Sequence, residues 1–429
     1  RGKTMSVIIE LNRKPTRKLV EAVKRKASSS SDKFQVHRRM SALNVISGRL
    51  PIRCLHRLCR HRHVKRIYPN GKVRVHLNVA TPAVGAAKLQ RRGIGGKGIT
   101  IAIIDTGVFP HKDLTRPVNR IIAFKDLLRN RKKPYDDNGH GTHLAGDAAG
   151  NGFVSCGKYR GPANRANLVV VKAFDRNGLA DSADVIAAID WVLRHRKTYN
   201  IRILNMSFGS PGFLRCADDP VCRAAERAWK AGLVVVTAAG NNGPGRSTIE
   251  SPGISPLLLT VGAVDDRRTI RQQDDRVAEF SGRGPAGGRV KPDITAPGVD
   301  IVSLRAPGSA IDLGDPEGRV GKCYFRMSGT SMATPIVAGA AAQLLQLRPS
   351  LKPQRVKKLL MRHAFRLRAG VDAQGSGELN LRFAARKLAP RCGVRRRRSR
   401  VYYAARCRLI HRRYRAWSCR RSNCASCRG

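Results

Sequence analysis

The chain contains no long uncharged apolar segment. Among its 429 residues no run of 18 uncharged apolar residues occurs, so we expect no segment to span a membrane. The chain begins at Arg1, and no apolar stretch typical of a signal peptide follows it. The sequence therefore leaves the location open, since secretion and an intracellular site are both compatible with it.

Acidic residues are scarce. The sequence has 29 Asp and Glu against 83 Lys and Arg, which gives a formal net charge of +54. The basic residues are spread over nearly the whole chain. A surface of this charge binds nucleic acids or anionic lipids non-specifically, whether or not such binding is its function. We therefore expect non-specific polyanion binding, but the charge alone identifies no function.

The cysteines lack the spacing of metal ligands. Six of the 11 cysteines precede the last 39 residues, and none of the six belongs to a recognisable metal motif. Among them Cys216 and Cys222 lie close enough in sequence for one local disulfide, although buried thiols are also compatible with the pattern. The redox compartment stays open.

The last segment, residues 391–429, lacks acidic residues and apolar periodicity. It carries 14 Arg and five Cys. A core needs apolar periodicity, so we expect a disordered basic extension or the product of a shifted reading frame. The cysteine spacing matches no common zinc site, which disfavours a zinc knuckle, and an arginine-rich nucleic-acid arm is a further alternative.

Residues 1–80 alternate strand-like and helix-like patterns. The pattern predicts a strand over 7–11, a helix over 15–26, loosely alternating residues over 34–50, a helix over 52–61, a hairpin turn at Asn70-Gly71 and a strand over 72–79. Together these elements predict a small α+β domain.

A buried parallel sheet is predicted for the middle of the chain. Residues 98–105 form a continuous apolar run that ends in Asp105, as in a strand buried on both faces. The alternation of such runs with helical patterns predicts an α/β fold. In it, a doubly wound, mostly parallel sheet has helices on both faces and active groups at the carboxyl ends of its strands. The further predicted strands cover 167–173, 201–206, 233–238 and 257–261, and the helices cover 182–194, 221–231 and 333–347.

Ser331 stands where a loop is predicted to turn into a buried helix. Gly329 and Thr330 precede it, and an Ala-rich run that opens with Pro335 follows. At such a turn the hydroxyl would be exposed beside backbone N–H groups that point towards a negative oxygen, which suits a nucleophile. Without other motifs, the same residues could merely cap a core helix.

His140 and Asn241 occupy two further unusual stretches. His140 lies between two glycines at the start of a helix of small residues, where a substrate backbone can approach closely, and His143 would point inwards. Either histidine alone could be a surface or metal residue, but their spacing, without an intervening Glu, disfavours metal-dependent hydrolysis. Asn241 follows an apolar strand, and its amide could donate to an oxyanion or simply belong to a turn.

These stretches resemble the subtilisin-like serine proteases. The resemblance covers about residues 80–390, and Arg120 to Asp126 and Pro134 to Asp137 look most like the bacterial AprX-type branch. Gly282 departs from the pattern, since a second Ser is more usual there. The matching motifs, in the order typical of the fold, are Asp105-Thr106-Gly107, His140-Gly141-Thr142-His143, Asn205-Met206-Ser207-Phe208-Gly209, Ala238-Ala239-Gly240-Asn241 and Gly329-Thr330-Ser331-Met332-Ala333.

The resemblance implies a role for four residues. Ser331 would be the nucleophile, His140 its general base and then general acid, and Asp105 the carboxylate that orients the imidazole. Asn241 and the backbone N–H of Ser331 would form the oxyanion hole. This chemistry requires no cofactor. Structural calcium is frequent in the family, but the sequence does not assign its ligands.

The resemblance also implies where polypeptide substrates bind. Ser207-Phe208-Gly209 and Ala238-Ala239-Gly240 would flank the pocket for the residue before the scissile bond, with the peptide added as a strand. Their small side chains predict an open apolar slot and broad specificity that leans to large apolar residues. The acidic pair Asp136-Asp137 could favour basic side chains nearby.

The resemblance divides the chain into three parts. Residues 1–80 would be a propeptide whose carboxyl end occupies the active-site cleft, 81–390 the catalytic domain and 391–429 the tail. We expect self-cleavage between Leu77 and Val84. A binding protein on a degenerate protease scaffold is the alternative, but such a scaffold would usually have lost a catalytic position, and all four are present. The sequence therefore favours a serine endopeptidase.

Overall fold

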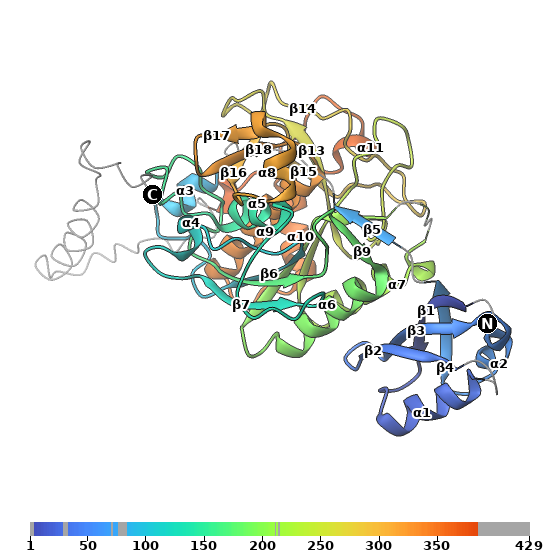
Figure 1. The fold of residues 1–429 in the computed structure, drawn as a ribbon. Coiled ribbons are helices and arrows are strands. Elements are labelled where there is room, and N and C mark those ends of the chain that lie inside the picture. The colour runs from blue at the N-terminus through green and yellow to red at the C-terminus, as the bar shows by residue number, and fades with distance from the viewer. Residues whose placement is uncertain are drawn as a thin grey trace, which may run out of the picture.

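The structure is a computed structural model that describes residues 4–28, 33–69, 72–75, 84–210, 212 and 215–384. The predicted tail over 391–429 lies outside these residues. Figure 1 shows a small N-terminal unit, coloured blue, beside a much larger unit. Each unit has a sheet of its own. Among the described residues, no helix has the length and apolar character needed to cross a membrane.

The N-terminal unit is an antiparallel sheet in the order β2-β3-β1-β4, with two helices. Its first helix begins at Arg17 because the hydroxyl of Thr16 accepts a hydrogen bond from the backbone N–H of Leu19 and so caps it. The loosely alternating stretch over 34–50 forms two paired strands. The elements are β1 (Thr4–Leu11), α1 (Arg17–Lys26), β2 (Gln35–Met40), β3 (Val45–Pro51), the 3-10 helix η1 (Ile52–Cys54), α2 (Leu55–Cys59) and β4 (Val64–Pro69).

Strand β1 is buried on both faces because each face covers a different core. Val7, Ile9 and Leu11 pack with α1 and α2 in a core within the N-terminal unit. Ile8, which lies between them, belongs to the core of the large unit. Since side chains alternate between the faces of a strand, one face of this sheet carries the helices and the other packs on the large unit.

The large unit is built on an eight-stranded sheet in the order β14-β13-β12-β10-β6-β8-β7, with β15 beside β13. All neighbours are parallel except β13 and β14. The five predicted strands are present, so the α/β prediction is confirmed. The strands are β6 (Thr100–Asp105), β7 (Ile121–Asp126), β8 (Asn167–Lys172), β10 (Ile201–Met206), β12 (Val234–Ala238), β13 (Leu259–Asp265), β14 (Arg276–Val277) and β15 (Ile294–Pro297).

Helices cover the sheet of the large unit. Helices α5 and α9 pack on each other and on the central strands, and α6 and α7 pack on each other on the side of the N-terminal unit (Figure 1). The helices are α3 (Ala86–Gln90), α4 (Lys112–Thr115), α5 (His140–Ala149), α6 (Ser182–His195), α7 (Pro220–Lys230), α8 (Ala310–Gly314), α9 (Thr330–Leu347), α10 (Pro353–Arg362) and α11 (Val371–Gln374), with 3-10 helices η2 (Cys216–Asp218) and η3 (Pro316–Gly318).

Ion pairs and a hydrogen bond to buried carboxylates attach the N-terminal unit to α7 and α6. Glu10 is only 3% exposed, and its Oε1 accepts hydrogen bonds from Arg223 and Arg227 of α7, each at 2.8 Å. On α6, a carboxylate oxygen of Asp190 accepts from the backbone N–H of Ala42 at 2.5 Å. A buried charge is tolerated only when it is paired, so these contacts fix how the N-terminal unit sits on the two helices.

Strand β5 (Lys72–Val75) leaves the N-terminal sheet and joins the large unit. It lies antiparallel between β9 (Leu179–Asp181) and β11 (Phe208–Gly209) in a three-stranded sheet. The predicted hairpin at Asn70-Gly71 is therefore wrong: β4 pairs with β1, while β5 pairs with strands distant in sequence. The turn itself lies outside the described residues.

A further small sheet has the order β16-β18-β17 and consists of β16 (Ile301–Leu304), β17 (Arg319–Val320) and β18 (Tyr324–Met327).

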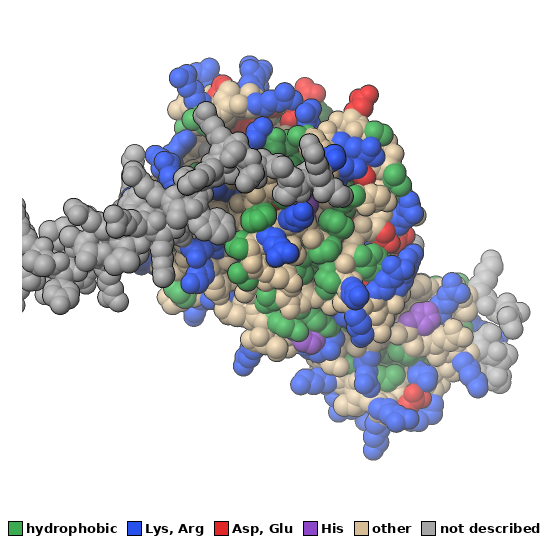
Figure 2. All heavy atoms as spheres, turned by 60° about the vertical axis from the view of Figure 1, so that its left-hand side comes forward, with side chains coloured by type: hydrophobic (Ala, Val, Ile, Leu, Met, Phe, Trp, Pro, Cys, Tyr) green, Lys and Arg blue, Asp and Glu red, His purple; other side chains and the backbone are tan. Residues whose placement is uncertain are grey.

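Basic side chains outnumber acidic ones on the surface. Figure 2 shows Lys and Arg side chains over both units on the visible face, with few acidic side chains between them. Much of the acidic minority is inside the protein or at the contact of the two units, for example Glu10, Asp105 and Asp190.

Candidate active site

Asp105 and His140 form a buried hydrogen-bonded pair. Asp105 is the last residue of β6, and His140 is the first residue of α5. Oδ1 of Asp105 lies 2.8 Å from Nδ1 of His140, and both side chains are fully buried. The same oxygen accepts from the backbone N–H of Thr106 at 2.8 Å. A carboxylate that accepts from Nδ1 leaves Nε2 as the ring nitrogen able to accept a proton.

Asp136 holds the start of α5 against the loop after β6. Its Oδ1 accepts from the hydroxyl of Thr106 at 2.9 Å and from the backbone N–H of Gly139 at 2.8 Å. Its Oδ2 accepts from the backbone N–H and the hydroxyl of Thr142 at 2.8 and 2.6 Å. The predicted role of this acidic residue towards basic substrate side chains is wrong, because its oxygens bind within the protein.

Lys172 also fixes this loop, and the sequence analysis did not identify it. It ends β8 and is 1% exposed. Its ammonium group donates to the backbone carbonyls of Thr106 and Phe174 at 2.5 and 2.9 Å and to Oδ1 of Asp137 at 2.6 Å. Both acidic residues of this loop therefore bind within the protein: Asp137 pairs with Lys172, and Asp136 binds Thr106 and Thr142. The one available indication in the sequence was a lysine at the end of a buried apolar strand.

His143 points into the structure, as predicted, and binds protein groups. Its Nδ1 lies 2.9 Å from Oδ2 of Asp147, and its Nε2 lies 3.2 Å from the carbonyl oxygens of Ile301 and Phe325. Burial raises the pKa of Asp147 above its usual value, and the adjacent His143 offsets only part of that rise. With both ring nitrogens engaged, His143 connects α5 to strands β16 and β18.

Ser331 lies in the first turn of α9. The helix begins at Thr330, three residues earlier than predicted, and Pro335 lies inside it. Oγ of Ser331 donates a hydrogen bond to the backbone carbonyl of Ser207 at 3.0 Å. The expectation of an exposed hydroxyl is wrong: Ser331 is fully buried, and Ser207, between β10 and β11, lies against its hydroxyl.

Asn241 lies beside the start of α9. Its Oδ1 accepts from the backbone N–H of Thr330 at 3.0 Å and from the Thr330 hydroxyl at 2.9 Å. Thr330 directly precedes Ser331, so these bonds hold the Asn241 amide next to the serine. Because Oδ1 is used as an acceptor, Nδ2 is the end of the amide that can donate to a ligand.

The two predicted substrate-binding segments lie on either side of a carboxylate. Ser207-Phe208-Gly209 includes β11, which pairs with β5. Ala238-Ala239-Gly240 ends β12 and binds the backbone of Glu250, whose N–H donates to the carbonyl of Ala239 at 2.9 Å. The predicted open apolar slot is therefore wrong in one respect, because Glu250, which the sequence analysis missed, lies between the two segments.

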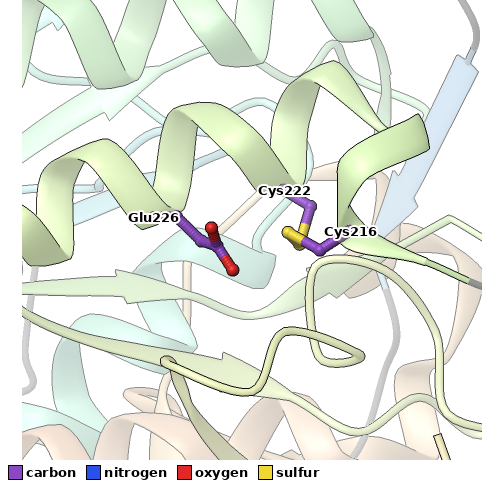
Figure 3. Close-up of side chains that lie close together, drawn as sticks. All are labelled: Cys216, Cys222 and Glu226. Atoms are coloured by element: carbon purple, nitrogen blue, oxygen red, sulfur yellow. A yellow bond between two sulfur atoms is a disulfide. The ribbon is translucent and has the colours of Figure 1, made fainter. Parts of the chain in front are cut away.

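Cys216 and Cys222 form a disulfide, which settles the alternative left open by the sequence. Among the described residues, these two cysteines and Glu226 are the one group of at least three His, Cys, Asp or Glu side chains close enough to share a metal ion. Figure 3 shows the disulfide beside the Glu226 carboxylate on α7. A disulfide lacks the thiolates that bind metals, so this group does not fit a metal.

The chain matches the family model described as the subtilase family, Peptidase S8, over residues 96–385. The chain belongs to the subtilase family of serine proteases. It is 46% identical over 331 residues to the serine protease AprX of Bacillus subtilis. The aligned residues make up 75% of this chain and 74% of AprX. This places the chain in the AprX branch, as the sequence motifs predicted. The subtilase is thus a serine endopeptidase that acts on polypeptides.

Other relatives support the same family. The subtilase is 32% identical over 341 residues to the thermostable alkaline protease of Halalkalibacterium halodurans. The aligned residues make up 79% of this chain and 82% of that protease. The solved structure of fervidolysin from Fervidobacterium pennivorans, described as a keratinolytic enzyme related to subtilisin, aligns with a TM-score of 0.71 and 24% identity. That alignment covers 91% of this chain and 62% of fervidolysin, so the chain spans less than two thirds of it, and the likeness supports the fold alone.

Proposed function

We propose that this subtilase hydrolyses peptide bonds through Ser331, His140 and Asp105 by way of an acyl-enzyme intermediate. Oγ of Ser331 attacks the carbonyl carbon, and Nε2 of His140 takes the hydroxyl proton and returns it to the leaving amine. Asp105 stabilises the imidazolium that forms. The observation that carries this proposal is the 2.8 Å hydrogen bond between the fully buried Asp105 and His140. The chemistry needs no cofactor.

Asn241 is proposed to donate Nδ2–H to the oxyanion of the tetrahedral intermediate, together with the backbone N–H of Ser331. Support comes from the two hydrogen bonds of Thr330 to Oδ1 of Asn241, which turn the amide donor away from Thr330. Ser331 lies at the N-terminal end of an 18-residue helix, where the helix dipole also favours negative charge.

Residues 1–80 are proposed to act as the propeptide of the subtilase. The buried ion pairs of Glu10 with Arg223 and Arg227 and the insertion of β5 beside β11 support this role. Self-cleavage between Leu77 and Val84 stays a prediction, since residues 76–83 lie outside the described part. Finding the same cleavage in a Ser331→Ala chain would exclude it.

The substrate is proposed to bind as an added strand on β11, in the place that β5 takes. The sequence predicted broad specificity with a preference for large apolar residues before the scissile bond. The two flanking segments contain Gly209 and Gly240, but the side chain of Glu250 occupies the space beside both glycines. The carboxylate of Glu250 lies between those segments, so it affects which substrate side chains can bind there.

A peptidase assay tests the proposed catalytic residues. We expect the wild-type chain to cleave an unfolded protein, and Ser331→Ala and His140→Ala each to reduce the rate by at least about 1,000-fold, because each removes one member of the proton-transfer chain. The matched control is Ser376→Ala, which changes a serine away from β11 and α9. Retained cleavage in the Ser331→Ala protein would contradict the proposal.

A further inference from the structure

We propose that Glu250 makes this subtilase prefer a Lys or Arg residue immediately before the scissile bond. The inference rests on the proposed function and names its substrate class. It replaces the apolar preference predicted from the small residues of the pocket walls.

Backbone hydrogen bonds tie Glu250 and the next residue to both segments that would flank the substrate residue, which are the walls of the proposed pocket. The N–H of Glu250 donates to the carbonyl of Ala239 at 2.9 Å, on the wall that follows β12. The next residue, Ser251, exchanges two backbone hydrogen bonds of 2.9 and 3.1 Å with Ser210, which follows β11 on the other wall. The position of Glu250 is therefore set by the same two segments that would bind the substrate.

The side chain of Glu250 fills the space that two glycines leave. A Cβ atom added to Gly209 would lie 2.0 Å from Oε2 of Glu250, and one added to Gly240 would lie 2.7 Å from its Cγ. Any larger residue at either glycine would displace the carboxylate. Glu250 is 3% exposed, and its Oε1 accepts a hydrogen bond from Nδ2 of Asn242.

The register of β5 indicates which substrate residue faces Glu250. In that strand Val75 is opposite Phe208, and Arg74 is opposite Gly209. A substrate bound in the same register has its next residue opposite Ser207, whose carbonyl oxygen lies 3.0 Å from Oγ of Ser331. That substrate residue, beside the nucleophile, is the one before the scissile bond.

The side chain of this substrate residue points towards the carboxylate. Residues directly opposite each other in an antiparallel pair point to the same face, and so do residues two apart in one strand. The substrate residue opposite Ser207 therefore shares a face with position 209. That face is the one on which Glu250 lies, because the direction of a Cβ on Gly209 leads to Oε2.

A long basic side chain fits this arrangement best. Lys and Arg can bury their apolar stems along the pocket walls and place the cation on the carboxylate. A large apolar side chain would place no hydrogen-bond donor against the buried carboxylate, and an acidic one would add repulsion. A charge-assisted hydrogen bond of this kind changes binding by about 10- to 100-fold.

Peptides that differ only in the residue before the scissile bond test the inference. We would measure kcat/KM for the Lys, Arg, Leu and Phe peptides with the full chain and with Glu250→Gln. The wild type is expected to cleave Lys and Arg peptides at least about 10-fold faster than Leu and Phe peptides, and in Glu250→Gln this ratio falls by about 10- to 100-fold. The matched control, Glu317→Gln, removes an exposed charge on η3 and keeps the wild-type ratio.

The ratio within one protein sample does not depend on the fraction that is correctly folded, so a destabilised variant still gives an answer. If Ser331 is labelled by a fluorophosphonate but Leu and Phe peptides are cleaved at least as fast as Lys and Arg peptides, the inference is overturned and the proposed function stands. An unchanged ratio in Glu250→Gln also overturns it. No cleavage of any peptide and no label on Ser331 would overturn both.

Discussion

The Asn241 side chain accepts hydrogen bonds from Thr330 through Oδ1, and its Nδ2 is the proposed donor to the oxyanion. We predict that Asn241→Leu lowers kcat by about 100- to 1,000-fold with little change in KM, because the donor to the oxyanion is lost. The same change leaves Thr330 without its acceptor, so the thermal midpoint should also fall. Steady-state kinetics and thermal unfolding measure the two effects. The control Asn177→Leu, at an exposed turn, should leave both unchanged, and normal turnover in Asn241→Leu would refute the role.

Asp266 is the residue from which we expect a pH-dependent stability. Burial, and to a smaller extent the neighbouring Asp275, Asp265 and Asp300, raise its pKa to about 6, although a hydrogen bond from the N–H of Arg268 acts to lower it. Because the folded-state pKa lies above the unfolded value, this group's contribution is complete below about pH 4 and is lost as the pH rises through 6.

We therefore predict that Asp266→Asn removes part of the loss of stability between pH 4 and 7. Urea unfolding across this range, in a Ser331→Ala background that cannot digest itself, measures the effect. Asp218→Asn, an exposed change of the same type, is the control. Parallel pH profiles for the wild type and Asp266→Asn would contradict the prediction.

Individual residues differ in how far the sequence could reveal them. Asp105, His140 and Ser331 each adjoin glycines and small residues in motifs with a fixed order, and this local pattern identified them. Glu250 has no such pattern, because its position depends on two segments that meet only in the folded chain. Asp136 was recognised as acidic, but its internal hydrogen bonds could not be inferred from the sequence.

At the scale of an element, the start of α5 depends on close approach to the loop after β6. A Cβ atom on Gly141 would lie 2.2 Å from the carbonyl oxygen of Gly107 and 3.1 Å from Oδ1 of Asp105. We predict that Gly141→Ala moves His140 away from Asp105 and lowers kcat by about 100-fold or more. The same assay on Gly370→Ala, which has no atom within 4 Å of its added Cβ, should give wild-type activity. Equal kcat for both variants would contradict this account.

The elements that the sequence predicted well are strands in which most residues are apolar. Strands β6 and β12 are buried at every residue, and β10 at every residue except Arg202, so apolar side chains occur on both faces of each strand. Strand β5 shows the limit of such reasoning. Asn70-Gly71 is typical of a hairpin, but the pairing of β5 with β9 and β11 is decided by contacts between distant parts of the chain.

At the scale of the whole molecule, the charge is the dominant feature. The net charge is +54, and since residues 391–429 contain 14 Arg and no acidic residue, about +40 remains without them. We propose that the body of the subtilase binds polyanions non-specifically. A chain ending at residue 390 should still bind heparin and elute when the salt concentration rises, with its peptidase activity intact. Loss of heparin binding on this truncation would assign the binding to the tail.

The central claim is that the chain acts through one activated serine, Ser331. The most direct measurement is reaction with a fluorophosphonate, followed by mass spectrometry of the labelled peptide. The account predicts one label, on Ser331, that disappears in Ser331→Ala and is strongly reduced in His140→Ala. A label on another residue, or equal labelling of the wild type and Ser331→Ala, would contradict it.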